Sequence, residues 1–277
     1  MTTNYCLRIS AAFNCNCFHG LIILVACFSS LQSGAQSYDG LNNLKGHQTQ
    51  VYYSNGAAAK AQRIAGQLDK VIGFYEEQLK FKPSVTLLVL SPQDWSRYSQ
   101  SVVYGMPHYT DAHTLIVASE NNAFWKSFIP PTDKLPGEQA ADIIKTYTGK
   151  DGQLSMEPFF DLLAIHELGH AYHEQAGLQM QRSWMGELFV NIFLHSYIAS
   201  KEPALLPALT SFPKMVVSLT NRKDLKYTSL NDLEKKYDEL SQQFPNNYGW
   251  YQCRWHTAAG NIFDKAGMDA IKNYGWF

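Results

Sequence analysis

The segment His166-Glu167-Leu168-Gly169-His170 combines residue types that can bind a metal ion and hydrolyse a substrate. On a helix, residues four positions apart lie on one face, about one turn from each other. The imidazoles of His166 and His170 can therefore meet at a single tetrahedral zinc ion. Glu167 lies to the side of this pair, where its carboxylate can take a proton from water that the metal activates. The His-Glu-x-x-His pattern thus predicts a zinc site with Glu167 as general base.

The motif needs a helix, and the flanking residues predict one over residues 158–176. Pro158 stands at a first helical position, where its missing N–H costs nothing, and Gly177 is placed to end the helix. Gly169, inside this helix, lowers helix propensity by about 1 kcal/mol relative to alanine. We expect a neighbouring element to pass closely over that turn, which would explain the glycine.

Glu187 is the predicted third metal ligand. It lies on the next expected helix, residues 184–200, which a turn at 177–183 folds back against the motif helix. Asn191, one turn further along the same face, could hydrogen-bond the outer nitrogen of His166 or His170 and fix its tautomer. The site is therefore expected to be built from two helices.

His173 is closer in sequence than Glu187, but geometry argues against it as a ligand. It lies seven residues past His166, an axial separation of about 10 Å, and three ligands along one straight helix cannot close a tetrahedron. The metzincin continuation, with glycine three and histidine six residues past the second histidine, is absent, since His173 and Ala176 occupy those positions. We interpret His173 as a residue beside the site or on the surface.

The motif and the following Trp184-x-x-Glu187 resemble the gluzincin peptidases, the thermolysin-like branch of zinc metallopeptidases, and among them the small secreted bacterial domains. The firm resemblance covers residues 164–191. It implies that the two motif histidines and Glu187 bind one Zn²⁺, that Glu167 is the general base, and that a sheet precedes the active-site helix.

Other parts of the chain match that family less closely. The segment Asn122-Ala123-Phe124-Trp125 resembles the stretch that pairs with substrate backbone in these enzymes. Gluzincins also stabilise the oxyanion with a Tyr or His from a later helix, and this sequence offers Tyr248, Tyr251 and His256. Tyr251 is the first choice, because Tyr251-Gln252 at the start of a helix resembles the family's Tyr-bearing helix. Where the family often has Gly-Ala after the ligand Glu and Asp one turn later, this chain has Leu188-Phe189 and Asn191.

These residues predict an exported zinc-dependent metallopeptidase that hydrolyses peptide bonds with Glu167 as general base and Tyr251 at the oxyanion. We expect a peptide or protein substrate, held by strand addition on an edge strand at 114–119. The absent Gly-x-Met-Glu-Asn signature of the family's aminopeptidases favours endopeptidase action. Two alternatives stay open: a zinc hydrolase with another substrate, such as a cell-envelope component, and a non-catalytic binding domain on the same scaffold.

The hydrophobic pattern predicts an α+β fold of the zincin type, in which an N-terminal mixed sheet with helices precedes a mostly helical half that carries the active-site helix. Strands are expected at 49–54, 85–90 and 115–118, and a long amphipathic helix at 57–79. Helices are expected at 138–148, 158–176, 184–200, 203–219, 230–243 and 248–266.

Composition and the N-terminus bear on the setting of this domain. The net charge is −1 and basic residues are scattered, which argues against nucleic acid as a partner. Residues 1–35 have the order of a signal peptide: one Arg, the apolar run LIILVACF, and Ser33-Gly34-Ala35. We therefore expect export, a single catalytic domain over 36–277, and no transmembrane helix in the mature chain. Leu24-Val25-Ala26-Cys27 resembles a lipobox, so lipid anchoring at Cys27 is the alternative to simple secretion.

Overall fold

The structure is a computed structural model that describes residues 37–99, 101 and 103–272. The predicted signal peptide, the lipobox and Cys27 lie outside the described residues. Cys253 has a free, buried thiol.

The N-terminal part of the described chain forms a five-stranded mixed sheet in the order β1-β2-β3-β5-β4. Strands β2, β3 and β5 run parallel, whereas β1 and β4 are antiparallel edge strands. The inner strands β3 and β5 are apolar and almost wholly buried, as is usual for parallel strands covered on both faces. The strands are β1 (Asn42–Leu44), β2 (Gln50–Tyr53), β3 (Thr86–Leu90), β4 (His108–Thr110) and β5 (Thr114–Ala118).

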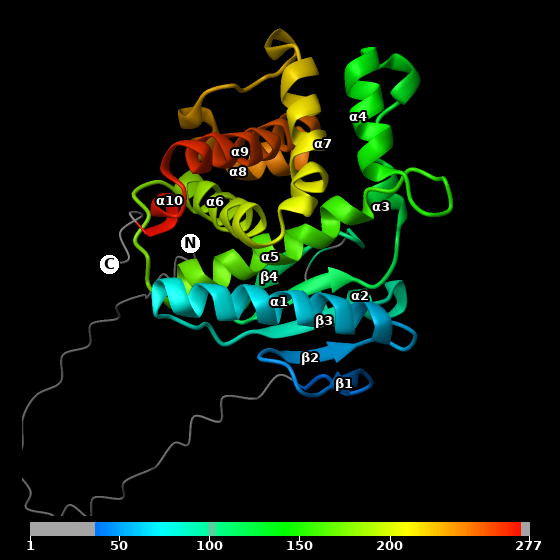
Figure 1. Ribbon diagram of the computed structural model, residues 1–277, viewed down its shortest axis with the longest axis vertical. Coiled ribbons are helices and arrows are strands. Elements are labelled where there is room, and N and C mark those ends of the chain that lie inside the picture. Colours follow the sequence, from blue (N-terminus) through cyan, green and yellow to red (C-terminus); the bar gives the residue numbers. More distant parts are fainter. Residues whose placement is uncertain (1–36, 100, 102, 273–277) are drawn as a thin grey trace, which may run out of the picture. The chain divides into compact units, whose positions relative to one another are not determined.

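Helix α1 (Ala58–Leu79) connects β2 to β3 and lies along the sheet (Figure 1). Its buried residues recur every three or four positions, as expected for a helix with one apolar face. Tyr75 on that face stacks on Phe193, with ring centroids 3.8 Å apart, and its hydroxyl donates to the carbonyl oxygen of Phe193 at 2.6 Å. This contact joins the sheet half of the molecule to the helical half.

The C-terminal half is mostly helical. Helix α5 (Glu157–Gln175) contacts α1, β4 and β5 of the sheet half, and also α6 and α7 of the helical half (Figure 1). Helix α5 therefore lies between the sheet and helices α6 and α7, which in turn pack against α9. The remaining helices are α2 (Pro92–Tyr98), α3 (Ala123–Lys126), α4 (Gly137–Tyr147), α6 (Ser183–Lys201), α7 (Leu206–Leu219), α8 (Leu230–Gln243), α9 (Pro245–Ala266) and α10 (Asp269–Lys272), with short 3₁₀ turns at Thr132–Lys134, Pro203–Leu205 and Arg222–Asp224.

The predicted α+β organisation is confirmed, with a mixed sheet before a helical half. The expected helix over 203–219 divides into a 3₁₀ turn and α7. The prediction of an edge strand at 114–119 is wrong, because β5 lies between β3 and β4. The edge strand next to β5 is β4, which was not predicted.

Strand β4 was missed because it has three residues and joins β5 through an unusual turn. Asp111 and Ala112, the central residues of this turn, have φ angles of 47° and 59°. Such left-handed pairs are typical of type I′ hairpin turns, which normally carry Asn or Gly. Ala112 gives no such signal in the sequence.

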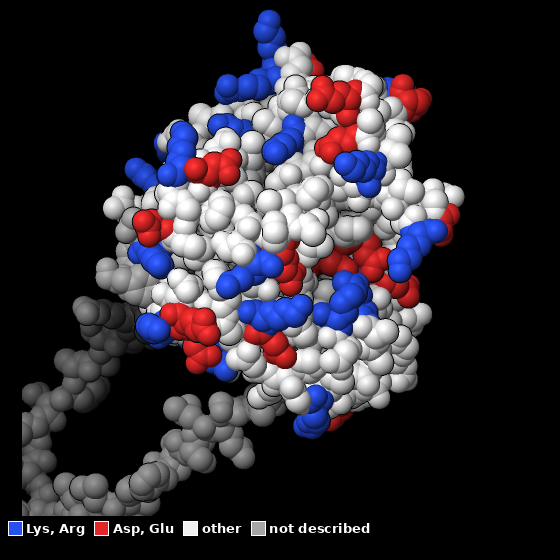
Figure 2. All heavy atoms as spheres, in the orientation of Figure 1, with Lys and Arg blue, Asp and Glu red and all other residues white. Residues whose placement is uncertain are grey.

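The face drawn in Figure 2 shows Lys and Arg side chains interspersed with Asp and Glu, without a continuous patch of either sign. Among the described helices, none combines the length and apolar character needed to cross a membrane.

Candidate metal centre

Helix α5 is held against α1 by a buried ion-pair cluster near its N-terminus. The Lys60 ammonium lies 2.7 Å from the Glu157 carboxylate and also pairs with Asp161. Arg63 pairs with the same two carboxylates. Lys60 is only 8% exposed, so removing both of its carboxylate partners would leave its charge buried without compensation. The cluster therefore fixes the start of the motif helix relative to α1.

Gly169 lets α6 approach α5 closely. A Cβ atom at Gly169 would lie 3.0 Å from Cβ of Val190 and 3.3 Å from the ring of Phe193. Any larger residue would push the two helices apart. The close neighbour that was expected over this turn is therefore α6, the helix that carries Glu187.

The close packing brings His166, His170 and Glu187 together. One potential ligand atom from each of these residues lies within 4.8 Å of the others. The Glu187 carboxylate oxygens lie 3.5 Å from Nε2 of His166 and 3.7 Å from Nε2 of His170. Ligands at about 2.1 Å from a tetrahedral zinc ion are about 3.4 Å apart. Two imidazole nitrogens and a carboxylate oxygen gathered in this way could hold one metal ion.

The protonation of these three side chains reflects their mutual contacts. Burial alone would raise the pKa of Glu187, but the hydrogen bond with His166 and the two histidine charges lower it to about 2. Burial lowers the pKa of His170 to about 4. Burial also opposes protonation of His166, but the hydrogen bond with Glu187 and the negative charges of Glu167 and Glu187 together outweigh it and raise the pKa of His166. At neutral pH the carboxylate of Glu187 is therefore ionised and the imidazole of His170 is neutral, which are the protonation states in which both side chains bind a metal.

Glu167 is buried beside this group, with an exposed fraction of 9%. Burial raises the pKa of its carboxyl to about 8, the positive charge of His166 lowers it, and the negative charge of Glu187 raises it. A hydrogen bond from the backbone of Tyr109, in edge strand β4, stabilises the ionised form. The pKa of Glu167 thus depends both on the metal group and on the backbone of β4.

Asn191 lies next to the metal group, as the sequence suggested. Its Nδ2 donates to the carbonyl oxygen of Glu187 at 2.8 Å. Its Oδ1 and Nδ1 of His166 are both buried, and neither has a partner in strict hydrogen-bond geometry within the described part of the chain. The Asn191 side chain nevertheless contributes a hydrogen-bonding effect to the pKa of His166. An Nδ1–H of His166 directed at Asn191 Oδ1 would satisfy both atoms and leave Nε2 free for a metal.

A tyrosine pair lies close to the carboxylates of the site. The hydroxyls of Tyr237 and Tyr248 are 2.9 Å apart. Burial raises the pKa of Tyr237 to about 12, with further contributions from Glu187 and Glu167. Burial also raises the pKa of Tyr248, and the nearby side chain of Gln252 lowers the pKa of both Tyr248 and Glu187.

Tyr237 and Gln252 were not predicted from the sequence, whereas Tyr248 was one of three candidates. Helix α8 is distorted at Lys236, which has φ −124° and ψ 21°, directly before Tyr237. Isolated kinks of this kind often occur at functional sites. The i, i+4 series Tyr248, Gln252, His256 on α9 is the sequence signal that could have indicated which face meets α6.

Tyr251, which the sequence suggested as the residue that stabilises the oxyanion, is buried and contacts the start of α8. Its side chain has no exposed surface, and its hydroxyl donates to the carbonyl oxygen of Ser229 at 2.7 Å. The charged groups that act on its pKa are Asp232, Arg254 and Arg222. Tyr251 holds the start of α8 against α9, so we no longer assign it the oxyanion role. His256 lies nearer to the site, with its ring centroid 6.3 Å from that of His166.

Two further sequence expectations concern residues near the motif. His173 lies outside the metal group and packs 3.4 Å from the position of a Cβ on Gly186, in agreement with its interpretation as a residue beside the site. The segment 122–125 does not form a strand that could pair with substrate. Asn122 caps α3 by accepting the N–H of Trp125 at 3.0 Å, and Trp125 is buried.

Comparison of the chain with models of protein families, with curated proteins and with solved structures finds no match. The functional argument therefore depends on the site itself.

Proposed function

We propose that this protein is an exported zinc-dependent metallopeptidase with a zincin-like fold. The observation that carries the proposal is the convergence of His166, His170 and Glu187, with the buried carboxylate of Glu167 beside them. Two histidines and one glutamate form a ligand set of catalytic zinc sites, which keep a coordination position for substrate or water. The resemblance of residues 164–191 to gluzincins supports the same assignment.

His166, His170 and Glu187 would hold the zinc ion, with Asn191 orienting the imidazole of His166. Bound zinc would supply a Lewis acid that polarises a carbonyl oxygen and lowers the pKa of water toward about 7. Glu167, whose raised pKa the positive charge of a bound zinc ion would lower, would take the proton from the attacking water and return it to the leaving amine. Hydrogen bonding from the backbone of Tyr109 lowers the pKa of Glu167 and so favours the ionised form that this transfer needs.

Edge strand β4 is the element best placed to bind a peptide. Among the described strands it pairs only with β5, so we propose that its other side, which lies against α5, accepts an added strand. Tyr109, whose backbone contacts Glu167, lies in the middle of β4. A peptide paired with β4 would therefore run past the general base, as strand addition requires.

Tyr237 and Tyr248 would stabilise the negative charge that develops on the carbonyl oxygen. Their hydroxyls form one hydrogen-bonded pair, and the charge of Glu187 acts on the pKa of both residues. Burial raises both pKa values, so both hydroxyls stay protonated and able to donate at neutral pH. Donors fixed in a site that excludes water stabilise such charge more strongly than donors in solvent.

The test combines metal analysis with peptide cleavage. The wild-type protein should contain one zinc per chain and cleave a peptide library, whereas Glu167→Gln should retain zinc and lose cleavage. Glu174→Gln, on the same helix but outside the metal group, is the matched control and should behave as wild type. Purified protein that cannot bind zinc would refute the proposal. Zinc binding without cleavage of any peptide would favour another hydrolytic substrate or a non-catalytic binding domain.

A further inference from the structure

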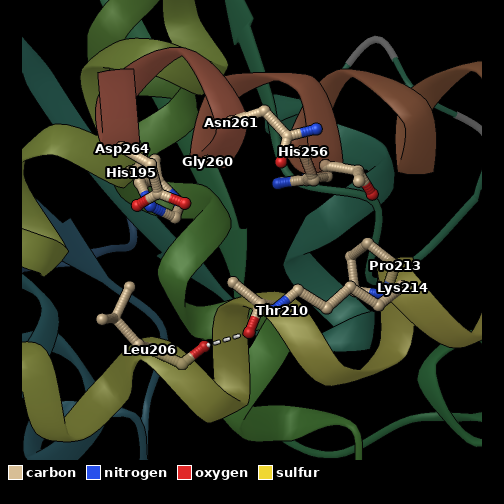
Figure 3. A pocket seen from close by; sticks show the side chains of 10 residues that line it. His195, Leu206, Thr210, Pro213, Lys214, His256, Gly260, Asn261 and Asp264 are labelled. Atoms are coloured by element: carbon tan, nitrogen blue, oxygen red, sulfur yellow. Dashed lines mark hydrogen bonds between the residues drawn. The ribbon is translucent and has the colours of Figure 1, made fainter. Parts of the chain in front are cut away.

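A second polar pocket lies between α6, α7 and α9 (Figure 3). It has a volume of about 190 Å³, and His195 and His256 form part of its wall. His256 also neighbours the metal group through its ring contact with His166. None of the residues assigned to the proposed peptidase lines this pocket, so its chemistry needs a separate account.

His195 contributes a largely buried imidazole to the wall of the pocket. It is 7% exposed, and its Nδ1 is buried without a hydrogen-bond partner among the residues that the structure describes. Buried polar atoms in native proteins nearly always have a partner in the protein or in ordered water. Burial lowers the pKa of His195, so the ring is neutral and offers one donor and one acceptor.

Two opposite charges line the same pocket from different helices. Lys214 comes from α7 and Asp264 from α9, and their charges act on His195 with opposite sign (Figure 3). Both residues are exposed at the mouth of the pocket, and within the described chain neither of them belongs to an ion pair. Leu206 and Pro213 add an apolar part to the wall. The pocket thus offers a cation, an anion, a neutral imidazole and an apolar surface.

This combination excludes simpler ligands. A metal ion would be repelled by Lys214, and His195, His256 and Asp264 do not form a three-ligand group in the described structure. An inorganic anion would be repelled by Asp264. A molecule that carries both a carboxylate and an ammonium group would satisfy both charges, with Lys214 on its carboxylate and Asp264 on its ammonium.

The volume of the pocket limits the size of the ligand that it can bind. A cavity of about 150 Å³ takes up benzene, a ligand of six heavy atoms. At about 190 Å³ this pocket suits a ligand slightly larger than that, such as a free amino acid with an aliphatic side chain. We propose that the pocket between α6, α7 and α9 binds a zwitterionic α-amino acid, with its side chain against Leu206 and Pro213.

The test measures binding of L-leucine to the whole chain by calorimetry, with NMR to locate the site. An excess of chelator keeps metal away, so the result does not depend on the proposed peptidase activity. L-leucine should bind saturably and shift the signals of Asn261 and Gly260. Isopentylamine and 4-methylpentanoate, which each lack one charged group, should bind about tenfold more weakly or worse, because each leaves one charge unpaired.

Variants separate the two charged contacts. Lys214→Met and Asp264→Asn should each weaken leucine binding by about tenfold or more. Lys150→Met and Asp133→Asn remove exposed charges of the same types elsewhere and should leave it unchanged. Absence of saturation, equal binding of leucine and its half-molecules, tighter binding of inorganic phosphate, or unchanged affinity in both pocket variants would overturn the proposal.

Discussion

Gly169 of α5 lies directly against Val190 of α6, so that a Cβ on the glycine would be 3.0 Å from Cβ of the valine. Val190 is three residues past Glu187, about one turn along the same helix. The closeness of these two backbones therefore sets the distance between the histidine pair and the third ligand. A glycine that weakens the helix locally is what allows the metal group to form.

Gly169→Ala should separate the two helices. Forcing a methyl group into this contact should cost about 1–3 kcal/mol, and zinc affinity should fall by about tenfold or more, as it does when the support of metal ligands is disturbed. Denaturant unfolding and zinc titration measure the two effects. Gly66→Ala is the control, because nothing lies within 4 Å of a Cβ there. It should gain up to about 1 kcal/mol through helix propensity. Equal stability of both variants would contradict this account of Gly169.

Zinc affinity should distinguish the role of Glu187, a proposed metal ligand, from that of Asn191, which orients a ligand. Asn191→Ala should weaken zinc binding by about 10–100-fold, the usual effect of removing a group that orients a ligand. Glu187→Ala removes a ligand itself and should weaken zinc binding further. Competition with a chromogenic chelator gives both dissociation constants. If Asn191→Ala bound zinc as tightly as wild type, the contact between Asn191 and His166 would have no part in holding the metal.

Most of the metal group could be predicted because it depends on local rules. The spacing of His166 and His170 places both on one helix face, and the short turn before Glu187 forces the second helix back along the first. The same axial argument correctly kept His173 out of the group. Each of these inferences needs only helix geometry and chain connectivity.

The features that the sequence did not predict depend on how the helices and strands pack, which the spacing of residues along the chain does not reveal. Tyr251 and Gln252 are adjacent in sequence, but their side chains point about 100° apart around α9. The sequence does not show which face of α9 meets the metal group, and Tyr251 lies on a face that contacts Ser229 instead. Tyr237 reaches the site through a helix that is distorted at Lys236. Strand β4 depends on a turn in which Ala112 adopts a left-handed conformation. No residue preference signals either distortion.

Cys253 should be unreactive in the folded protein. Burial raises the pKa of its thiol from 9.0 to about 12, which lowers the thiolate fraction by about a thousandfold at pH 8. Since the thiolate is the reactive form, labelling of folded protein should be slow and should rise about tenfold per pH unit. The measurement is the difference in labelling between wild type and Cys253→Ala, which removes the contribution of the other cysteines. Rapid labelling at pH 8 without denaturant would show that α9 opens or that the thiol is accessible.

The two tyrosines near the carboxylates should act on catalysis rather than on metal binding. Tyr237→Phe and Tyr248→Phe should each lower kcat by about 10²–10³-fold, the loss seen when one donor to a developing oxyanion is removed. KM and zinc content should change little, because neither hydroxyl belongs to the metal group. Tyr251→Phe is the matched control on the same helix. It removes the hydrogen bond to Ser229 and should cost about 1 kcal/mol of stability without affecting kcat. If Tyr251→Phe lowered kcat while Tyr237→Phe and Tyr248→Phe did not, the proposed role of Tyr237 and Tyr248 would be wrong. The oxyanion would then have to be assigned to Tyr251.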